Sequence, residues 1–192
     1  MNDRVLVISG LDPTGGAGIA ADIETLNQFG VTSLPIVATL TVQNTQSVTQ
    51  LQAVDTQLIV EQFKHLTNDI DINVVKIGLL SSAEQITTIV KLLNEHEHLS
   101  IVLDPIVKAS TQDDLLNSES INALKKTLLP IVDVLTPNVA ELEVLAPNMD
   151  ESQAVASLGC EWVLLTTTDT SEKEIEHRLY HNAKLVQCFK YH

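Results

Sequence analysis

Oxygen-bearing side chains recur along this sequence, each placed just after an apolar stretch. Asp22 lies early in a helical pattern, Asp104 ends the apolar run 100–103, and Glu141 comes three residues after Asn138, which follows another apolar run. Carboxylates and amides can hold Mg²⁺ or recognise the polar edge of a small ligand. If the apolar runs are parallel strands, their carboxyl ends share the sheet edge where ligands bind. The pattern indicates such a site, while a turn after Asp104 and a helix-dipole role for Asp22 are the structural alternatives.

A glycine-rich loop separates the first apolar run from the first helical pattern. Residues 5–9 read as a buried strand that Gly10 ends, and the run 15–18 reads Gly-Gly-Ala-Gly directly before the helix. A strand, a glycine loop and a helix N-terminus together form a corner suited to an anion or another ligand. The loop matches neither Walker A nor G-x-G-x-x-G. We favour ligand binding over a turn whose glycines serve packing alone.

Composition excludes several classes of function. The chain has 192 residues, 44% of them hydrophobic, and a net charge of −14. This charge argues against a nucleic-acid or anionic membrane surface, and no apolar run reaches membrane-spanning length. Cys160 and Cys188 fit reduced thiols better than a disulfide framework, and the start of the chain lacks a secretion signal. We therefore expect a cytoplasmic protein that binds neither nucleic acid nor membrane.

Strand patterns alternate with helical patterns along the chain. Expected strands cover 5–8, 32–40, 73–78, 100–105, 133–138, 161–166 and 184–189, and expected helices cover 19–29, 55–66, 81–95, 115–129, 138–145 and 172–180. The polar stretch 41–47 reads as a loop. The alternation predicts a single α/β domain over residues 1–192, with a mostly parallel central sheet between two layers of helices.

Five segments taken in order resemble one known family. They are 8–18 with Asp22, 41–45, 76–80, 103–105, and 135–138 with Glu141. Together they are similar to the hydroxymethylpyrimidine/phosphomethylpyrimidine kinases, the thiamine-biosynthesis branch of the ribokinase-like fold. The resemblance extends to about Thr166.

The resemblance implies an ATP-dependent, Mg²⁺-assisted kinase. Such enzymes phosphorylate the hydroxymethyl group of 4-amino-5-hydroxymethyl-2-methylpyrimidine and then the resulting monophosphate. On this basis Asp22 and Gln43 would hold the pyrimidine. The remaining substrate-side residues implied are Gly10, Gly16, Ala17, and Leu79 or Leu80 covering the ring.

The nucleotide side is assigned on the same resemblance. Asp104, Lys108, Asn138 and Thr166 would lie near ATP, and Asp104 and Glu141 would order Mg²⁺ directly or through water. A homodimer is possible, as is usual in the family. The alternatives are a catalytically inactive pyrimidine-binding or regulatory homologue and a pyridoxal-type kinase, although Gln43 with Asp22 favours an aminopyrimidine.

One family motif has no counterpart in the sequence. The Gly-Thr-Gly-Cys loop, which cradles the transferring phosphoryl group, does not occur before the sequence ends at His192. We therefore expect a chain that is incomplete at its C-terminus, with its catalytic group unassigned. We also expect it to bind the pyrimidine better than it phosphorylates it, and to leave an apolar face of the sheet uncovered.

Overall fold

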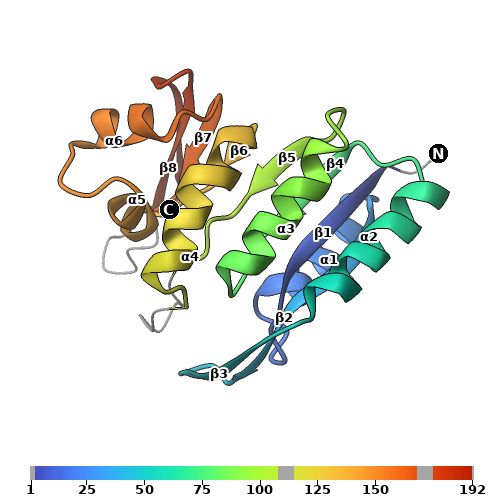
Figure 1. The fold of residues 1–192 in the computed structure, drawn as a ribbon. Helices are drawn as coiled ribbons and strands as arrows, with labels where there is room; N and C mark the ends of the chain where they lie inside the picture. Colours follow the sequence, from blue (N-terminus) through green and yellow to red (C-terminus); the bar gives the residue numbers. More distant parts are fainter. Residues whose placement is uncertain (1–2, 108–114, 168–174, 192) are drawn as a thin grey trace.

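A single mixed sheet organises the fold (Figure 1). The computed structural model describes residues 3–107, 115–167 and 175–191. Within them the strand order is β3-β2-β1-β4-β5-β6-β7-β8-β9. The strands are β1 (Arg4–Leu11), β2 (Thr32–Gln43), β3 (Val48–Ala53), β4 (Val74–Ile77), β5 (Ser100–Leu103), β6 (Val134–Leu135), β7 (Trp162–Leu165), β8 (Ile175–His181) and β9 (Lys184–Tyr191). Strands β2, β1 and β4 to β7 pair in parallel, whereas β3, β8 and β9 pair antiparallel. The expected α/β class is confirmed.

Helices lie on both faces of this sheet. They are α1 (Gly18–Gln28), α2 (Thr56–Asp69), α3 (Ala83–Asn94), α4 (Ser118–Ala123), α5 (Val139–Leu145) and α6 (Glu151–Leu158). Helix α4 continues into a π-helical turn, Leu124–Leu128, and a short 3₁₀ turn, Leu129–Ile131. Figure 1 shows α2, α3 and α4 side by side in front of the sheet, with α1 behind it. Right-handed crossovers explain why α1 and α3 lie on opposite faces. The connection from β1 to β2 runs towards one edge of the sheet, and the connection from β4 to β5 runs towards the other edge.

Strand β1 is the buried centre of the sheet, as expected. It pairs in parallel with β2 on one side and β4 on the other. Leu6, Val7 and Ile8 are fully buried, although consecutive residues of a strand face opposite sides. Burial on both sides requires helices on both faces, which is the environment of central parallel strands.

Two helices begin where the sequence predicts. The side chain of Asp55 accepts a hydrogen bond from the N–H of Leu58 (3.1 Å) and caps α2. The hydroxyl of Ser82 accepts one from the N–H of Gln85 (3.2 Å) and caps α3. Each cap satisfies a first-turn N–H that has no partner within its helix.

The helix expected over 172–180 is wrong. Residues 175–181 form β8, which pairs antiparallel with β7 and β9, and residues 172–174 lie outside the described part of the chain. Asn182 and Ala183 between β8 and β9 both have positive φ, 48° and 60°, which is typical of a two-residue hairpin turn. Glu and Lys in this stretch favour a helix, but hydrogen bonding to β7 and β9 on either side stabilises a strand instead. The loop expected over 41–47 is likewise a hairpin in part, because β2 reaches Gln43 and pairs with β3.

Helical cover is uneven along the parallel strands. Val75 and Ile77 of β4 are buried, whereas Val74 and Lys76, on the opposite face, are partly exposed. The same alternation occurs in β5, β6 and β7, where the partly exposed residues are Val102, Val134, Trp162 and Leu164. Parallel strands are usually buried on both faces. The face that carries Lys76 is therefore the less covered one in the described chain.

Among the helices of the described residues, none combines the length and the apolar character that crossing a bilayer requires.

Candidate functional site

The loop after β1 is held in shape by its own side chains. The carboxylate of Asp12 accepts hydrogen bonds from the N–H (2.8 Å) and the hydroxyl (2.9 Å) of Thr14. The N–H of Gly15 donates to the carbonyl of Asp12 (3.2 Å). Asp12 is buried, whereas Gly16 and Ala17 are exposed at the start of α1. The loop therefore presents a fixed backbone whose last two residues before the helix are open to solvent.

Two glycines of this region lie where a side chain would be crowded. Gly18 has φ +58°, and a Cβ atom there would lie 2.3 Å from the carbonyl oxygen of Gly10. A Cβ atom on Gly10 would lie 3.1 Å from the side chain of Leu79. Packing therefore accounts for a glycine at position 18, whereas at position 10 a side chain would require Leu79 to shift slightly. At Gly16 a Cβ atom would meet only ordinary contacts, so packing does not account for that glycine.

Three charged side chains from three elements converge at the carboxyl edge of the sheet. The ammonium Nζ of Lys76, on β4, lies 2.9 Å from Oδ2 of Asp22, on α1, and 3.8 Å from Oδ2 of Asp104, just after β5. The N–H of Asp104 donates to the carbonyl of Ile77 (2.9 Å), which fixes this residue beside β4. The sequence singled out Asp22 and Asp104 but assigned no role to Lys76, although a lysine inside an apolar strand was the available signal.

Two carboxyl groups at this edge have raised pKa values. Partial burial raises the pKa of Asp104, while nearby Lys76 lowers it and Asp22 raises it. Burial raises the pKa of Glu141 to about 7, opposed by its hydrogen bond from Asn138 and reinforced by the charge of Asp104. Removing carboxylates from water and placing them near one another both disfavour their charged forms. A cation bound between Asp104 and Glu141 would relieve that cost.

Magnesium fits this donor set. It prefers oxygen ligands, keeps several waters, and needs only one or two protein carboxylates. Asp104 and Glu141 supply such a pair. Within the described residues no group of three or more His, Cys, Asp or Glu is placed so that it could hold a metal ion.

Glu141 also has a structural task. Its carboxylate accepts a hydrogen bond from the N–H of Asn138 (2.8 Å), and the Asn138 side chain accepts one from the N–H of Glu141 (2.9 Å), which completes a capping box at α5. Thr166 lies beside Asn138 in an isolated parallel bridge, and its N–H donates to the carbonyl of Pro137 (2.9 Å). Three of the expected nucleotide-side residues are thus neighbours. Lys108 lies outside the described residues.

The expected substrate side is assembled only in part. Leu79 is buried against Gly10, and its N–H donates to the hydroxyl of Ser9 (3.2 Å), while Leu80 is also buried. Gln43 is partly exposed at the turn end of the β2–β3 hairpin, where the register shifts. Within the described chain no hydrogen bond joins Gln43 to Asp22, whose carboxylate is paired with Lys76. The structure therefore places Asp22 with Asp104 and Lys76.

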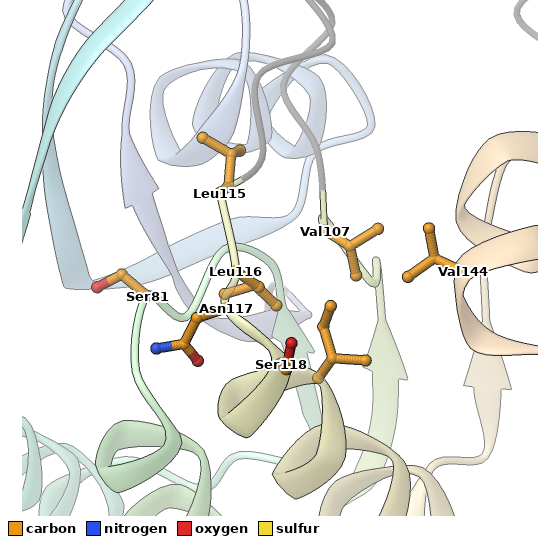
Figure 2. Close-up of a pocket in the computed structure, with 8 residues that line it drawn as sticks. Ser81, Val107, Leu115, Leu116, Asn117, Ser118 and Val144 are labelled. Atoms are coloured by element: carbon orange, nitrogen blue, oxygen red, sulfur yellow. The ribbon is translucent and has the colours of Figure 1, made fainter.

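A cavity of about 550 Å³ lies near the same edge of the sheet (Figure 2). Its lining comprises Ser81, Val107, Leu115, Leu116, Asn117, Ser118, Ile121 and Val144. None of the residues predicted from the sequence to form the site is among them. Asn117 is already engaged, because its side chain accepts a hydrogen bond from the N–H of Ser120 (2.8 Å) and caps α4. The cavity shares no lining residue with the charged cluster, and its wall combines aliphatic side chains with Ser81, Asn117 and Ser118.

Comparison with known proteins gives consistent matches. The family model described as phosphomethylpyrimidine kinase matches residues 12–191. A hydroxymethylpyrimidine/phosphomethylpyrimidine kinase of Staphylococcus aureus (strain Mu50) is 34% identical over 155 residues, which make up 80% of this chain and 56% of that relative. The chain thus spans about half the length of this curated relative.

Solved structures agree in fold. The crystal structure of phosphomethylpyrimidine kinase from Clostridium difficile 630 superposes with a TM-score of 0.85 at 27% identity, covering 98% of this chain and 84% of that one. The ADP complex of Bacillus subtilis pyridoxal kinase superposes with a TM-score of 0.84 at 24% identity, covering 100% of this chain and 75% of that one.

Proposed function

Because the chain belongs to the phosphomethylpyrimidine kinase family, we propose that it takes part in ATP-dependent phosphorylation of 4-amino-5-hydroxymethyl-2-methylpyrimidine and of its monophosphate. The observation that carries this proposal is the cluster in which Lys76 lies between Asp22 and Asp104 at the carboxyl edge of the sheet. Phosphoryl transfer needs positioned reactants and neutralised charge more than it needs covalent chemistry from the protein. The cluster and its surroundings supply groups for both tasks.

The pyrimidine would bind beside α1. The carboxylate of Asp22 accepts hydrogen bonds and suits the amino group of an aminopyrimidine, and the amide of Gln43 can both donate and accept at the ring edge. Gln43 belongs to the β2–β3 hairpin. For both side chains to contact one pyrimidine, this hairpin would have to bring Gln43 towards Asp22. The exposed backbone at Gly16 and Ala17 and the Gly10–Leu79 contact would bound the ring side of this subsite.

The nucleotide would bind on the Asp104 side. Asp104 and Glu141 would hold Mg²⁺ directly or through water, and bound Mg²⁺ neutralises phosphate charge in this class of reaction. Asn138 and Thr166 lie together next to Glu141 and would face the phosphates. Lys108 is proposed as a further phosphate contact on the family resemblance alone. The acidic chain needs the metal here, because a net charge of −14 repels ATP.

The test of this proposal is calorimetry of the full chain with hydroxymethylpyrimidine, with Mg-ADP, and with both. We expect binding of each, and slow turnover when Mg-ATP replaces Mg-ADP. Absence of pyrimidine binding would overturn the proposed function.

Replacing Asp22 by Ala should weaken pyrimidine binding by about 1–3 kcal/mol, because it leaves a polar edge of the bound ligand without its partner. The exposed Glu24 lies on the same helix, so Glu24→Ala is the matched control and should bind normally. Titrations of the three chains with the pyrimidine check this. Unchanged affinity in Asp22→Ala would show that Asp22 serves the helix or the ion pair alone.

Two alternatives can be separated in the same experiments. The structural similarity to a pyridoxal kinase supports a pyridoxal-type substrate as the second candidate, although at 24% identity it shows the fold alone. Tighter binding of pyridoxal than of hydroxymethylpyrimidine would favour it. A pyrimidine-binding or regulatory homologue without catalysis would bind the pyrimidine and show no turnover with Mg-ATP.

Oligomeric state and location belong to the same proposal. We propose a cytoplasmic protein that forms a homodimer. Light scattering of the purified chain tests the dimer, and cell fractionation tests the location.

A further inference from the structure

We propose that Lys76 is a positioning residue that couples the two subsites, because its single ammonium group is shared by Asp22 and Asp104. This inference rests on the proposed function, which places the pyrimidine at Asp22 and the metal and nucleotide at Asp104. It adds a residue that the sequence pattern left without a role, and it predicts that each ligand changes the affinity of the chain for the other.

The ammonium group is unequally divided between the two carboxylates. It donates a hydrogen bond to Asp22 at 2.9 Å, whereas Asp104 lies 3.8 Å away, at the outer limit of an ion pair. The side chains of Lys76 and Asp22 are only 21% and 20% exposed. Charges that are partly removed from water are screened less than surface charges, so this pair interacts more strongly than an exposed one.

The position of the ammonium group is limited by the backbone beneath it. A Cβ atom on Gly78 would lie 3.3 Å from Nζ of Lys76 and 2.2 Å from the hydroxyl of Ser9. The hydroxyl of Ser9 in turn accepts the N–H of Leu79. Lys76 stands on β4, between β1 and β5. The ammonium group of Lys76 thus lies close to the backbone of Gly78 and within ion-pair distance of both carboxylates.

The coupling follows from this sharing. With a metal–nucleotide complex bound at Asp104, that carboxylate would have another counter-charge and would no longer compete with Asp22 for Lys76. The ammonium group is then confined to Asp22 and fixes the orientation of its carboxylate before the pyrimidine arrives. Pre-ordering a binding group lowers the entropy that the ligand must overcome. Mg-ADP should therefore tighten pyrimidine binding, and by linkage the pyrimidine should tighten Mg-ADP binding by the same factor.

Calorimetry with hydroxymethylpyrimidine, in the absence and presence of saturating Mg-ADP, tests this. In the wild-type chain we expect affinity to rise by about five-fold or more with Mg-ADP. In Lys76→Met the ratio of the two affinities should fall to about one, and Lys76→Arg should restore most of it because the positive charge is retained. Lys91→Met, on the exposed side of α3, is the matched control and should keep the wild-type ratio.

A loss of packing alone would lower the pyrimidine affinity equally with and without Mg-ADP, and would leave the ratio of these two affinities unchanged. A folded Lys76→Met chain with the wild-type ratio would therefore overturn the proposal. If Lys76→Met does not fold, Asp22→Asn decides, since it removes the charge on the other side of the pair. The pyrimidine at saturation should then no longer tighten Mg-ADP binding, and persistent tightening would overturn the coupling. If the wild-type chain binds both ligands but Mg-ADP leaves its pyrimidine affinity unchanged, only the coupling is refuted. A chain that binds no pyrimidine refutes the proposed function, and the coupling with it.

Discussion

At about pH 8 the Glu141→Gln chain is expected to be more stable than the wild type by on the order of 3 kcal/mol, and to bind Mg-ADP less tightly. The pKa of Glu141 is raised from 4.5 to about 7 in the folded chain, so the folded state holds its proton more strongly than the unfolded state. The contribution of Glu141 to wild-type stability therefore falls as the pH rises from 4.5 to about 7. A glutamine has no such charge to bury, and its carbonyl can still accept the N–H of Asn138.

Urea unfolding near the two ends of that pH range measures the effect. The wild type and Glu141→Gln should have similar stability near pH 4.5, where the wild-type carboxyl is largely protonated in the folded state, and should diverge above it. Calorimetry should show Mg-ADP affinity lowered by about 10-fold or more, with pyrimidine affinity retained. Glu143→Gln, an exposed position on the same helix, is the control and should change neither. A parallel pH dependence for wild type and Glu141→Gln would contradict the assigned pKa.

The Gly18→Ala chain is expected to lose about 3 kcal/mol or more of folding free energy, because its new methyl group would press on backbone that cannot move aside. The Cβ atom would lie 2.3 Å from the carbonyl oxygen of Gly10, and the residue has φ +58°. Gly30 provides a matched control, since it has φ +72° but nothing within 4 Å of its Cβ position. Gly30→Ala should therefore cost only the strain of positive φ, about 1–2 kcal/mol.

Denaturant unfolding of the two variants separates the contact from the strain. The difference between Gly18→Ala and Gly30→Ala is the cost of the contact with Gly10, which joins the start of α1 to the end of β1. Equal losses in both variants would mean that the loop yields and that the close approach of Gly18 to Gly10 is not needed for the fold.

The parts of the site that could be predicted from the sequence are those determined by strand ends. Asp104 follows an apolar run, and Glu141 follows Asn138 with the spacing of a capping box, so a parallel sheet alone places both at one edge. The buried centre of β1 was predictable for a similar reason, since Leu6 and its neighbours are apolar on both faces.

The parts that could not be predicted depend on contacts between distant segments. Lys76 gains its role only when α1 and β5 bring Asp22 and Asp104 to it, from positions far apart in the chain. In isolation a lysine in a strand is compatible with a solvent-facing position. Strand β9 was predicted, but β8 was missed because its charged residues suit a helix, and β7 had to be known as its partner.

The sheet order also determines when this cluster can form. Strand β1 lies beside β4, although some sixty residues separate them in the chain, and these include α1, β2, β3 and α2. The β8–β9 hairpin needs only a two-residue turn, whereas closing β1 on β4 must overcome the entropy of a long loop. During synthesis the second edge of β1 therefore stays uncovered until β4 has been made. Because Asp22, Lys76 and Asp104 meet only after β1 has paired with β4, ligand binding at the cluster requires the pairing with the longest sequence separation in the described sheet.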